Sequence, residues 1–126
     1  MVEHSTNLIH TNLKILETIF QGYNKHMERY LIIFKGQVQG VGFRYTCQRI
    51  ATELDLTGSA KNLDNGNVEV EIQGDEDRIM TFIGKMIKQG NYLSVDGFTV
   101  RNLIRIEDYS LKKIECKQEK NFKILY

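Results

Sequence analysis

A glycine-rich segment, Gly36-Gln37-Val38-Gln39-Gly40-Val41-Gly42-Phe43-Arg44, separates two apolar patterns of different period. Arg29–Lys35 has the apolar content of a buried strand, whereas residues 44–55 place Cys47, Ile50, Ala51 and Leu54 at helical spacing. The segment therefore predicts a sharp strand-to-helix turn. Several backbone N–H groups converge in such a turn and form an anion cradle at the helix N-terminus. Arg44 adds a planar cation suited to phosphate oxygens, so we expect a bound phosphoryl group.

Length and charge restrict the class of protein. A chain of 126 residues fits one domain with a modest core, and a net charge of +1 gives no basic field that would recruit nucleic acid. The apolar runs are too short to span a bilayer, and the N-terminus lacks a secretory signal. Two cysteines, Cys47 and Cys116, form neither a disulfide framework nor a metal-ligand spacing. These features predict a cytoplasmic protein without membrane, nucleic-acid, metal or cofactor binding.

Residues 1–28 differ from the rest of the chain, because they contain all three histidines, His4, His10 and His26, and no strand pattern. Their apolar residues alternate at spacings of four and three: Ile9, Leu13, Leu16, Phe20, Tyr23 and Met27. This spacing predicts an amphipathic helix that packs on its own domain or on a second copy. We therefore expect a helical extension over residues 1–28, a domain over 29–126, and a monomer or weak homodimer through the helix. Met27 is an alternative translation start.

The middle of the chain predicts a hairpin. Gly58–Leu63 is a weak strand, and Asp64-Asn65-Gly66 is a turn signal that favours type I′ geometry. Val68–Ile72 alternates apolar and acidic residues, so its valines and isoleucine should point inward.

A second helix should follow Gly74-Asp75, with a buried stripe of Ile79, Phe82, Ile83, Met86 and Ile87. Asp96–Ile106 is expected to be an irregular strand with Phe98, Val100 and Leu103 as core contacts, and Phe122–Tyr126 a last strand. The order strand, helix, strand, strand, helix, strand predicts an α+β fold. It should be a ferredoxin-like two-layer sandwich (βαββαβ), an antiparallel sheet with two helices on one face.

Three familiar motifs do not fit the glycine segment. A P-loop needs Gly-Lys-Ser or Gly-Lys-Thr at its end, and the Rossmann fingerprint needs different glycine spacing within parallel strands. The run Gly40–Phe43 faintly echoes an RNA-recognition motif, but that motif lies on a sheet strand and this run leads into a helix.

The chain resembles the acylphosphatase family. The resemblance rests on Gly36-x-Val38-Gln39-Gly40-Val41-Gly42-Phe43-Arg44, on Gly58-x-x-Lys61-Asn62-Leu63-Asp64-x-Gly66-x-Val68-Glu69, on Gln73-Gly74, and on Phe122-x-Ile124-x-Tyr126. It covers about residues 29–126. It implies a small hydrolase that needs no metal and cleaves small-molecule acyl phosphates to a carboxylate and phosphate.

By this resemblance, Arg44 binds the phosphate, the backbone amides of Gln39, Gly40, Val41, Gly42 and Phe43 complete the cradle, and Asn62 positions the attacking water. Two plainer interpretations remain open from the residues alone. Arg44 could be a surface arginine, although cations are disfavoured at helix N-termini. Asn62 could be a turn residue that caps the hairpin at Asp64–Gly66.

An alternative function is a binding module. Related domains lie inside hydrogenase-maturation carbamoyltransferases, where the fold handles carbamoyl phosphate as one step of a larger reaction. In that case the chain would need a partner, and the apolar seam Ile9–Met27 is the feature that argues for one.

Overall fold

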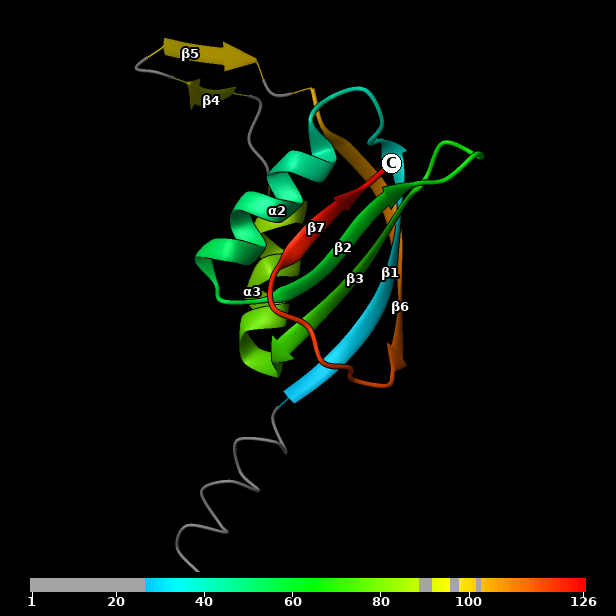
Figure 1. The fold of residues 1–126 in the computed structure, drawn as a ribbon. Helices are drawn as coiled ribbons and strands as arrows, with labels where there is room; N and C mark the ends of the chain where they lie inside the picture. The colour runs from blue at the N-terminus through cyan, green and yellow to red at the C-terminus, as the bar shows by residue number, and fades with distance from the viewer. Residues whose placement is uncertain (1–26, 89–91, 96–97, 102) are drawn as a thin grey trace, which may run out of the picture.

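The computed structural model describes residues 27–88, 92–95, 98–101 and 103–126 (Figure 1). The elements in chain order are β1 (Met27–Gln37), α2 (Phe43–Glu53), β2 (Thr57–Asn62), β3 (Val68–Asp75), α3 (Glu76–Ile87), β4 (Tyr92–Val95), β5 (Phe98–Arg101), β6 (Arg105–Ile114) and β7 (Phe122–Leu125). The predicted N-terminal helix lies outside the described residues, apart from Met27 and Glu28, which belong to β1 instead.

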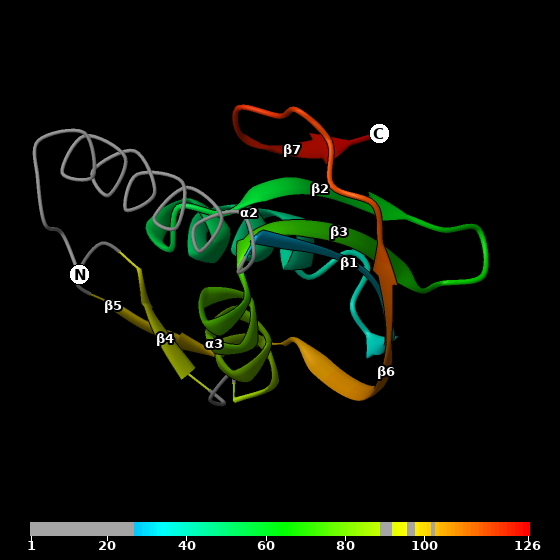
Figure 2. The ribbon, with the colours of Figure 1, turned by 90° about the horizontal axis from the view of Figure 1, so that it is seen from below.

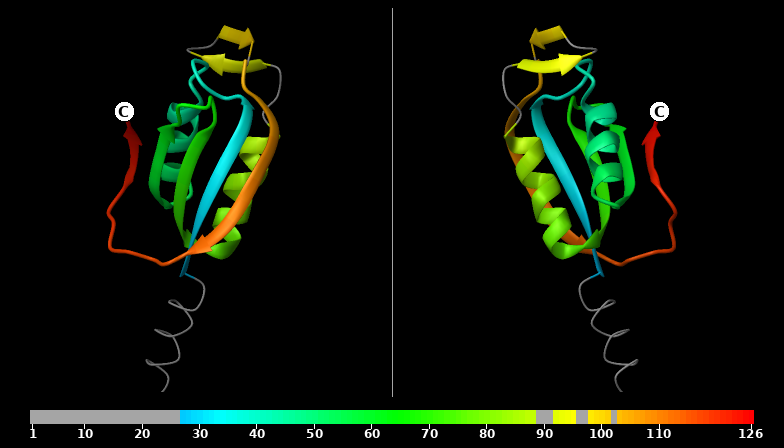
Figure 3. Two further views of the ribbon diagram at one scale, coloured as in Figure 1. Left: turned by 90° about the vertical axis from the view of Figure 1, so that its right-hand side faces the viewer. Right: turned by 90° about the vertical axis from the view of Figure 1, so that its left-hand side faces the viewer.

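Five strands form the main sheet in the order β6-β1-β3-β2-β7, and α2 and α3 lie against the same face of it (Figures 1 and 2). This arrangement confirms the predicted ferredoxin-like α+β sandwich. The neighbours β6, β1, β3 and β2 pair antiparallel, as expected. The last strand departs from the antiparallel prediction, since β7 runs parallel to β2. The chain leaves β6 at the end of the sheet where β2 begins (Figure 3). When it then forms β7 beside β2, both strands run from that end in the same direction.

The core lies between the sheet and the two helices. Alternating side chains of β1 and β3 face it, as the periodicity predicts: Tyr30, Ile32, Phe34, Val68, Val70 and Ile72. The helices contribute Cys47, Ile50, Ala51, Ile79, Phe82, Ile83 and Met86. Ile87 was expected in this stripe, but it lies at the last turn of α3 and is 44% exposed.

The fourth sheet strand is the main correction to the predicted elements. It lies at β6, later than the predicted Asp96–Ile106, and pairs with β1 along its length. Within the predicted range, β4 and β5 form a separate two-stranded sheet. Leu103, which was expected in the core, precedes β6 and is 48% exposed, whereas the neighbouring Ile104 is buried.

The β2–β3 turn also differs in type from the prediction. Leu63 N donates to Asn67 O at 2.9 Å, and Gly66 N donates to Leu63 O at 3.1 Å. Gly66 has a φ of 94°, but Asn65 does not have the positive φ that a type I′ turn requires at both central residues. The loop is therefore a type I turn followed by a left-handed glycine.

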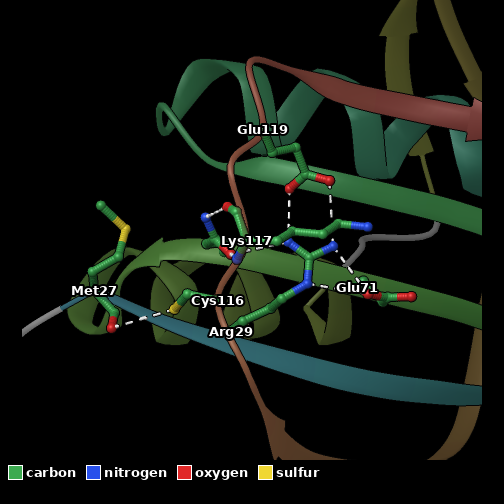
Figure 4. A network of polar contacts seen from close by, with 7 residues as sticks. Met27, Arg29, Glu71, Cys116, Lys117 and Glu119 are labelled. Atoms are coloured by element: carbon green, nitrogen blue, oxygen red, sulfur yellow. Dashed lines mark hydrogen bonds and ion pairs between the residues drawn. The ribbon is translucent and has the colours of Figure 1, made fainter.

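A buried arginine ties three parts of the fold together on the face of the sheet away from the helices (Figure 4). Arg29 is only 1% exposed. Its Nε and Nη2 donate to Glu71 Oε1 at 3.1 and 3.0 Å, and its Nη1 donates to Glu119 Oε1 at 2.7 Å. Nη1 also donates to Gln73 Oε1 at 3.1 Å. An unpaired buried charge would be very costly, so this network fixes where Glu119 can lie.

The side-chain amide of Gln73 holds the chain between β6 and β7. Its Nε2 donates to Lys117 O at 2.7 Å, and its Oε1 accepts from Lys117 N at 2.9 Å. Both backbone groups of Lys117 are thereby satisfied, as they would be in a strand pair. Together with Arg29, this contact directs the chain toward the edge of the sheet where β7 pairs with β2.

Burial alone would raise the pKa of the Glu119 carboxyl, but hydrogen bonds from Arg29 and Thr57 outweigh burial and hold the pKa below its usual 4.5. The carboxylate therefore stabilises the fold above its unfolded pKa, and this contribution is lost as the pH falls through the lower folded pKa. We expect Glu119→Gln to reduce the free energy of unfolding at pH 7 by about 1.5–3 kcal/mol. The difference from wild type should shrink at acid pH, which urea unfolding between pH 7 and pH 2 would measure.

Glu53→Gln is the matched control, because Glu53 pairs with Arg49 on an exposed helix face. It should change stability by less than about 0.5 kcal/mol. A Glu119→Gln deficit that stays constant down to pH 2 would contradict the assigned role of the Glu119 charge.

Candidate active site

The loop between β1 and α2 turns on two glycines in the left-handed region. Gly40 has a φ of 73° and Gly42 a φ of 76°, conformations that side chains other than glycine adopt at a cost. A Cβ built on either residue would meet no atom within 4 Å, so the loop borders open space at both positions. The glycines are therefore required by backbone conformation, and they leave the backbone accessible from outside.

The two helices begin in opposite ways. At α3, the Asp75 side chain accepts from the N–H groups of Asp77 and Arg78, and acidic residues occupy the first turn. At α2, the N-cap is Gly42, no side chain caps the helix, and the first turn contains no acidic residue. Among the residues that the structure describes, none accepts a hydrogen bond from the amides of residues 39–45. The positive end of α2 is thus left available to an external anion.

Two buried residues anchor the loop at its ends. Val38 and Phe43 are each 1% exposed, and the Phe43 ring contacts Phe34 edge-on with 5.1 Å between centroids. Val41 is half-buried and packs against the same core. The apolar residues of the motif therefore fix the loop to the core, while its glycines border open space.

Gln39 joins the loop to the β2–β3 turn through its side chain. Its Nε2 donates to Leu63 O at 2.7 Å and to Asn67 O at 2.8 Å. The sequence prediction assigned Gln39 only as a backbone donor of the cradle. Amide side chains are common in surface loops, so the sequence offered no signal for this tether.

Arg44 reaches across to the end of β7. Its Nη1 donates to Leu125 O at 2.7 Å, and its guanidinium carbon lies 4.9 Å from the centre of the Tyr126 ring. These contacts fix one edge of the guanidinium plane. The end of β7, where they are made, lies at the same end of the sheet as the loop between β1 and α2 (Figure 1). The contact with Leu125 spans 81 residues of sequence, and sequence reasoning did not predict it.

Asn62 is the last residue of β2 and lies between two of these contacts. The preceding residue, Lys61, pairs with Leu125, which accepts from Arg44. The following residue, Leu63, accepts from Gln39. The fold thereby brings Arg44, the loop and Asn62 to one end of the sheet.

The side chain of Asn62 is not the hairpin cap. That role belongs to Asn65, whose Oδ1 accepts from Asn67 N at 3.0 Å. The Oδ1 of Asn62 is buried and has no hydrogen-bond partner in the described part of the chain. A buried acceptor without a partner costs about 1–3 kcal/mol, so its retention calls for a reason.

Other reactive groups lie away from this end or outside the described residues. Cys47 is fully buried in the core, and burial raises the pKa of its thiol, which keeps it neutral and unreactive. Residues 27–88, 92–95, 98–101 and 103–126 contain no group of three or more His, Cys, Asp or Glu that could hold a metal ion. None of the helices in these segments combines the length and hydropathy needed to cross a bilayer. The three histidines precede residue 27.

Removing the tether should loosen the site. Gln39→Met preserves side-chain length but removes both hydrogen bonds to the β2–β3 turn. We expect the free energy of unfolding to fall by about 1–3 kcal/mol, measured by urea unfolding. Gln118→Met, at an exposed position in the chain between β6 and β7, serves as the control and should be neutral. Equal stabilities for the two variants would show that the tether is not energetically significant.

Comparison with known proteins identifies relatives of the whole described domain. The sequence model of the acylphosphatase family matches residues 30–124. The acylphosphatase of Clostridium beijerinckii is 45% identical over 101 residues, which cover 79% of this chain and 100% of the relative. That of Clostridium acetobutylicum is 41% identical over 101 residues, covering 79% and 99%. The crystal structure of acylphosphatase from Bacillus subtilis is similar with a TM-score of 0.65 and 31% identity, covering 79% of this chain and 99% of that one.

Proposed function

This chain belongs to the acylphosphatase family and hydrolyses acyl phosphates, and we propose that Arg44, the loop amides and Asn62 carry out the reaction. The products are a carboxylate and inorganic phosphate. The observation that supports these roles most directly is the uncapped start of α2. The same chain caps α3 with Asp75, whereas no residue that the structure describes accepts from the amides at the start of α2. An anion beside Arg44 would satisfy them.

The leaving group explains why so few residues are needed. An acyl phosphate expels a carboxylate, whose conjugate acid has a pKa near about 4, so no general acid has to protonate it. Phosphoryl transfer passes through a loose transition state, which leaves positioning and charge stabilisation to the protein. We therefore infer a reaction that uses neither a metal ion nor a cofactor.

The cradle would hold the phosphate through two kinds of donor. The backbone amides of Gln39, Gly40, Val41, Gly42 and Phe43 would donate from the loop, and the guanidinium of Arg44 would supply a fixed positive charge. The bond from Arg44 to Leu125 O uses Nη1 and holds the plane of the guanidinium. A prearranged plane loses less conformational entropy when it binds the phosphate.

Asn62 would orient the attacking water. Its Oδ1 is buried and has no partner among the described residues, so we infer that a rotation of the side-chain amide exposes Oδ1 and lets a water molecule donate to it. Oriented in this way, the water would attack phosphorus opposite the leaving carboxylate, and its proton would pass to a phosphate oxygen of the substrate. This route requires no side-chain base, in agreement with the absence of histidine from the described residues.

The partners and surroundings of the chain follow from the same proposal. The substrate is a small-molecule acyl phosphate, and we infer a cytoplasmic enzyme with no nucleic-acid partner. Residues 29–126 would form the catalytic domain and residues 1–28 a helical extension. That extension would leave the protein a monomer or pair it into a weak homodimer.

The test is phosphate release from benzoyl phosphate in the presence of EDTA. We expect rapid release by wild type, and a loss of about 10²–10³-fold or more in kcat for Arg44→Ala and for Asn62→Ala. Arg44→Ala should also weaken the binding of inorganic phosphate, whereas Asn62→Ala should leave that binding nearly unchanged. Arg78→Ala is the matched control, because Arg78 contacts Asp55 at an exposed site on α3.

Near-normal turnover by Asn62→Ala would remove that residue from the mechanism. A wild-type protein that binds phosphate at the loop yet releases none from benzoyl phosphate would favour the binding module. Activity that disappears with EDTA and returns with a divalent metal would contradict the metal-free mechanism.

A further inference from the structure

The strand β6 forms one edge of the main sheet. It pairs with β1 on one side, and no strand in the described residues pairs with its other side. In the left view of Figure 3, β6 lies in front of the sheet, and its orange ribbon faces the viewer along its whole length. At ten residues it is much longer than the opposite edge strand, β7, which has four. An open edge of this length presents a row of backbone groups that can pair with another strand.

The residues of β6 are mostly exposed, including two large apolar side chains. Tyr109 is 38% exposed and Leu111 is 42% exposed. They lie opposite Phe34 and Ile32 of β1, whose side chains are in the core. Tyr109 and Leu111 therefore lie on the helix-covered face, at the margin of the core, where the helices do not fully cover them.

The charges of β6 are ordered along the strand. Arg105 begins the strand, Glu107 and Asp108 come next, and Lys112 and Lys113 follow after Tyr109, Ser110 and Leu111. Suppose that two copies of β6 pair antiparallel with the two Ser110 residues opposite each other. Asp108 then faces Lys112 of the other copy, Glu107 faces Lys113, and Tyr109 faces Leu111.

Neighbouring registers and the parallel arrangement lack this match. If the antiparallel register shifts by one residue, each strand keeps only one acidic residue opposite a lysine of the other copy. If the strands instead pair parallel and in register, each charged residue lies opposite the same residue of the other copy. Opposite charges directly across a strand pair stabilise it, and like charges destabilise it. The charge order thus selects one direction and one register.

We propose that β6 is a self-complementary edge through which two copies of this chain pair antiparallel about Ser110, joining their sheets into one. In the pair, Tyr109 and Leu111 of both copies form a continuous apolar cluster on the helix-covered face. Asp108 and Lys112 lie opposite Lys35 and Leu31 of β1, so they project from the other face. The two faces of the junction are therefore stabilised by different interactions.

The pair formed by Asp108 and Lys112 is the main determinant of the register. Lys113 already contacts Glu28 at 3.4 Å within its own chain and lies over the Tyr30 ring. Glu107 of the other copy would therefore compete with Glu28 for the ammonium group of Lys113. No ion pair of Asp108 or Lys112 is found within the described part of the chain, although Asp108 Oδ1 accepts from Tyr109 N. The proposal does not depend on the catalytic roles, because β6 contributes no residue to the proposed site.

The test is sedimentation equilibrium of the full chain over a wide concentration range at low salt, where surface charges act most strongly. Wild type should be in monomer–dimer equilibrium. Asp108→Lys and Lys112→Asp should each weaken dimerisation about tenfold or more, since each change puts like charges opposite each other twice. An equimolar mixture of the two variants should form heterodimers, and the double variant D108K/K112D should regain the wild-type dimer. Glu53→Lys on α2 should have no effect.

The mixture separates interface loss from misfolding, because a misfolded variant would not pair with its complement. Benzoyl phosphate turnover should remain at the wild-type level in all four variants. A wild-type chain that stays monomeric at the highest concentration would overturn the proposal. A dimer that both single variants retain would also overturn it and would place the interface elsewhere, as in the seam Ile9–Met27.

Discussion

The start of α2 is the constraint from which the rest of the site follows. The first amides of a helix need acceptors, and the chain places left-handed glycines at 40 and at the N-cap position 42, so that no side chain caps α2. In our proposal the substrate phosphate accepts from these amides instead. This helix start persists only if the loop cannot rearrange to provide its own acceptors for these amides. Val38 and Phe43, both buried, prevent this by fixing the loop to the core on either side of the glycines.

The site is assembled by hydrogen bonds between segments far apart in sequence. Gln39 connects the loop to the turn after Asn62, and Arg44 connects α2 to β7, whose Leu125 lies opposite Lys61. The position of β7 depends in turn on the chain that leads to it. Arg29 and Gln73 hold that chain at Glu119 and Lys117, on the face of the sheet opposite the helices. Geometry at the site is therefore supported by contacts on both faces.

The strands and helices that bury one face were predictable from sequence, whereas the edge strand β6, which lacks such a face, was not. β3 alternates over Val68–Ile72 and α3 has a regular apolar stripe, so both were predicted close to their observed positions. β6 mixes charges with exposed Tyr109 and Leu111 because it is an edge strand, and it shows neither periodicity. Arg29 resembled a charge at a strand end, and its partner Glu119 is 90 residues away. Hydrophobic periodicity indicates which side of a strand or helix is buried, but it does not indicate which distant residues form an ion pair.

The site residues could be named because a motif marks them, but their surroundings required the fold. Without the structure, Asn62 could be either a site residue or the cap of the hairpin at Asp64–Gly66. The structure separates them, since Asn65 accepts a backbone hydrogen bond while the Oδ1 of Asn62 is buried without one. Natural folds retain an unsatisfied polar group where a function uses it, and that cost is hard to justify for a turn residue. The energetic penalty at Asn62 and the uncapped start of α2 are thus the same kind of observation: each is a polar group without a partner among the described residues, and each supports the proposed site.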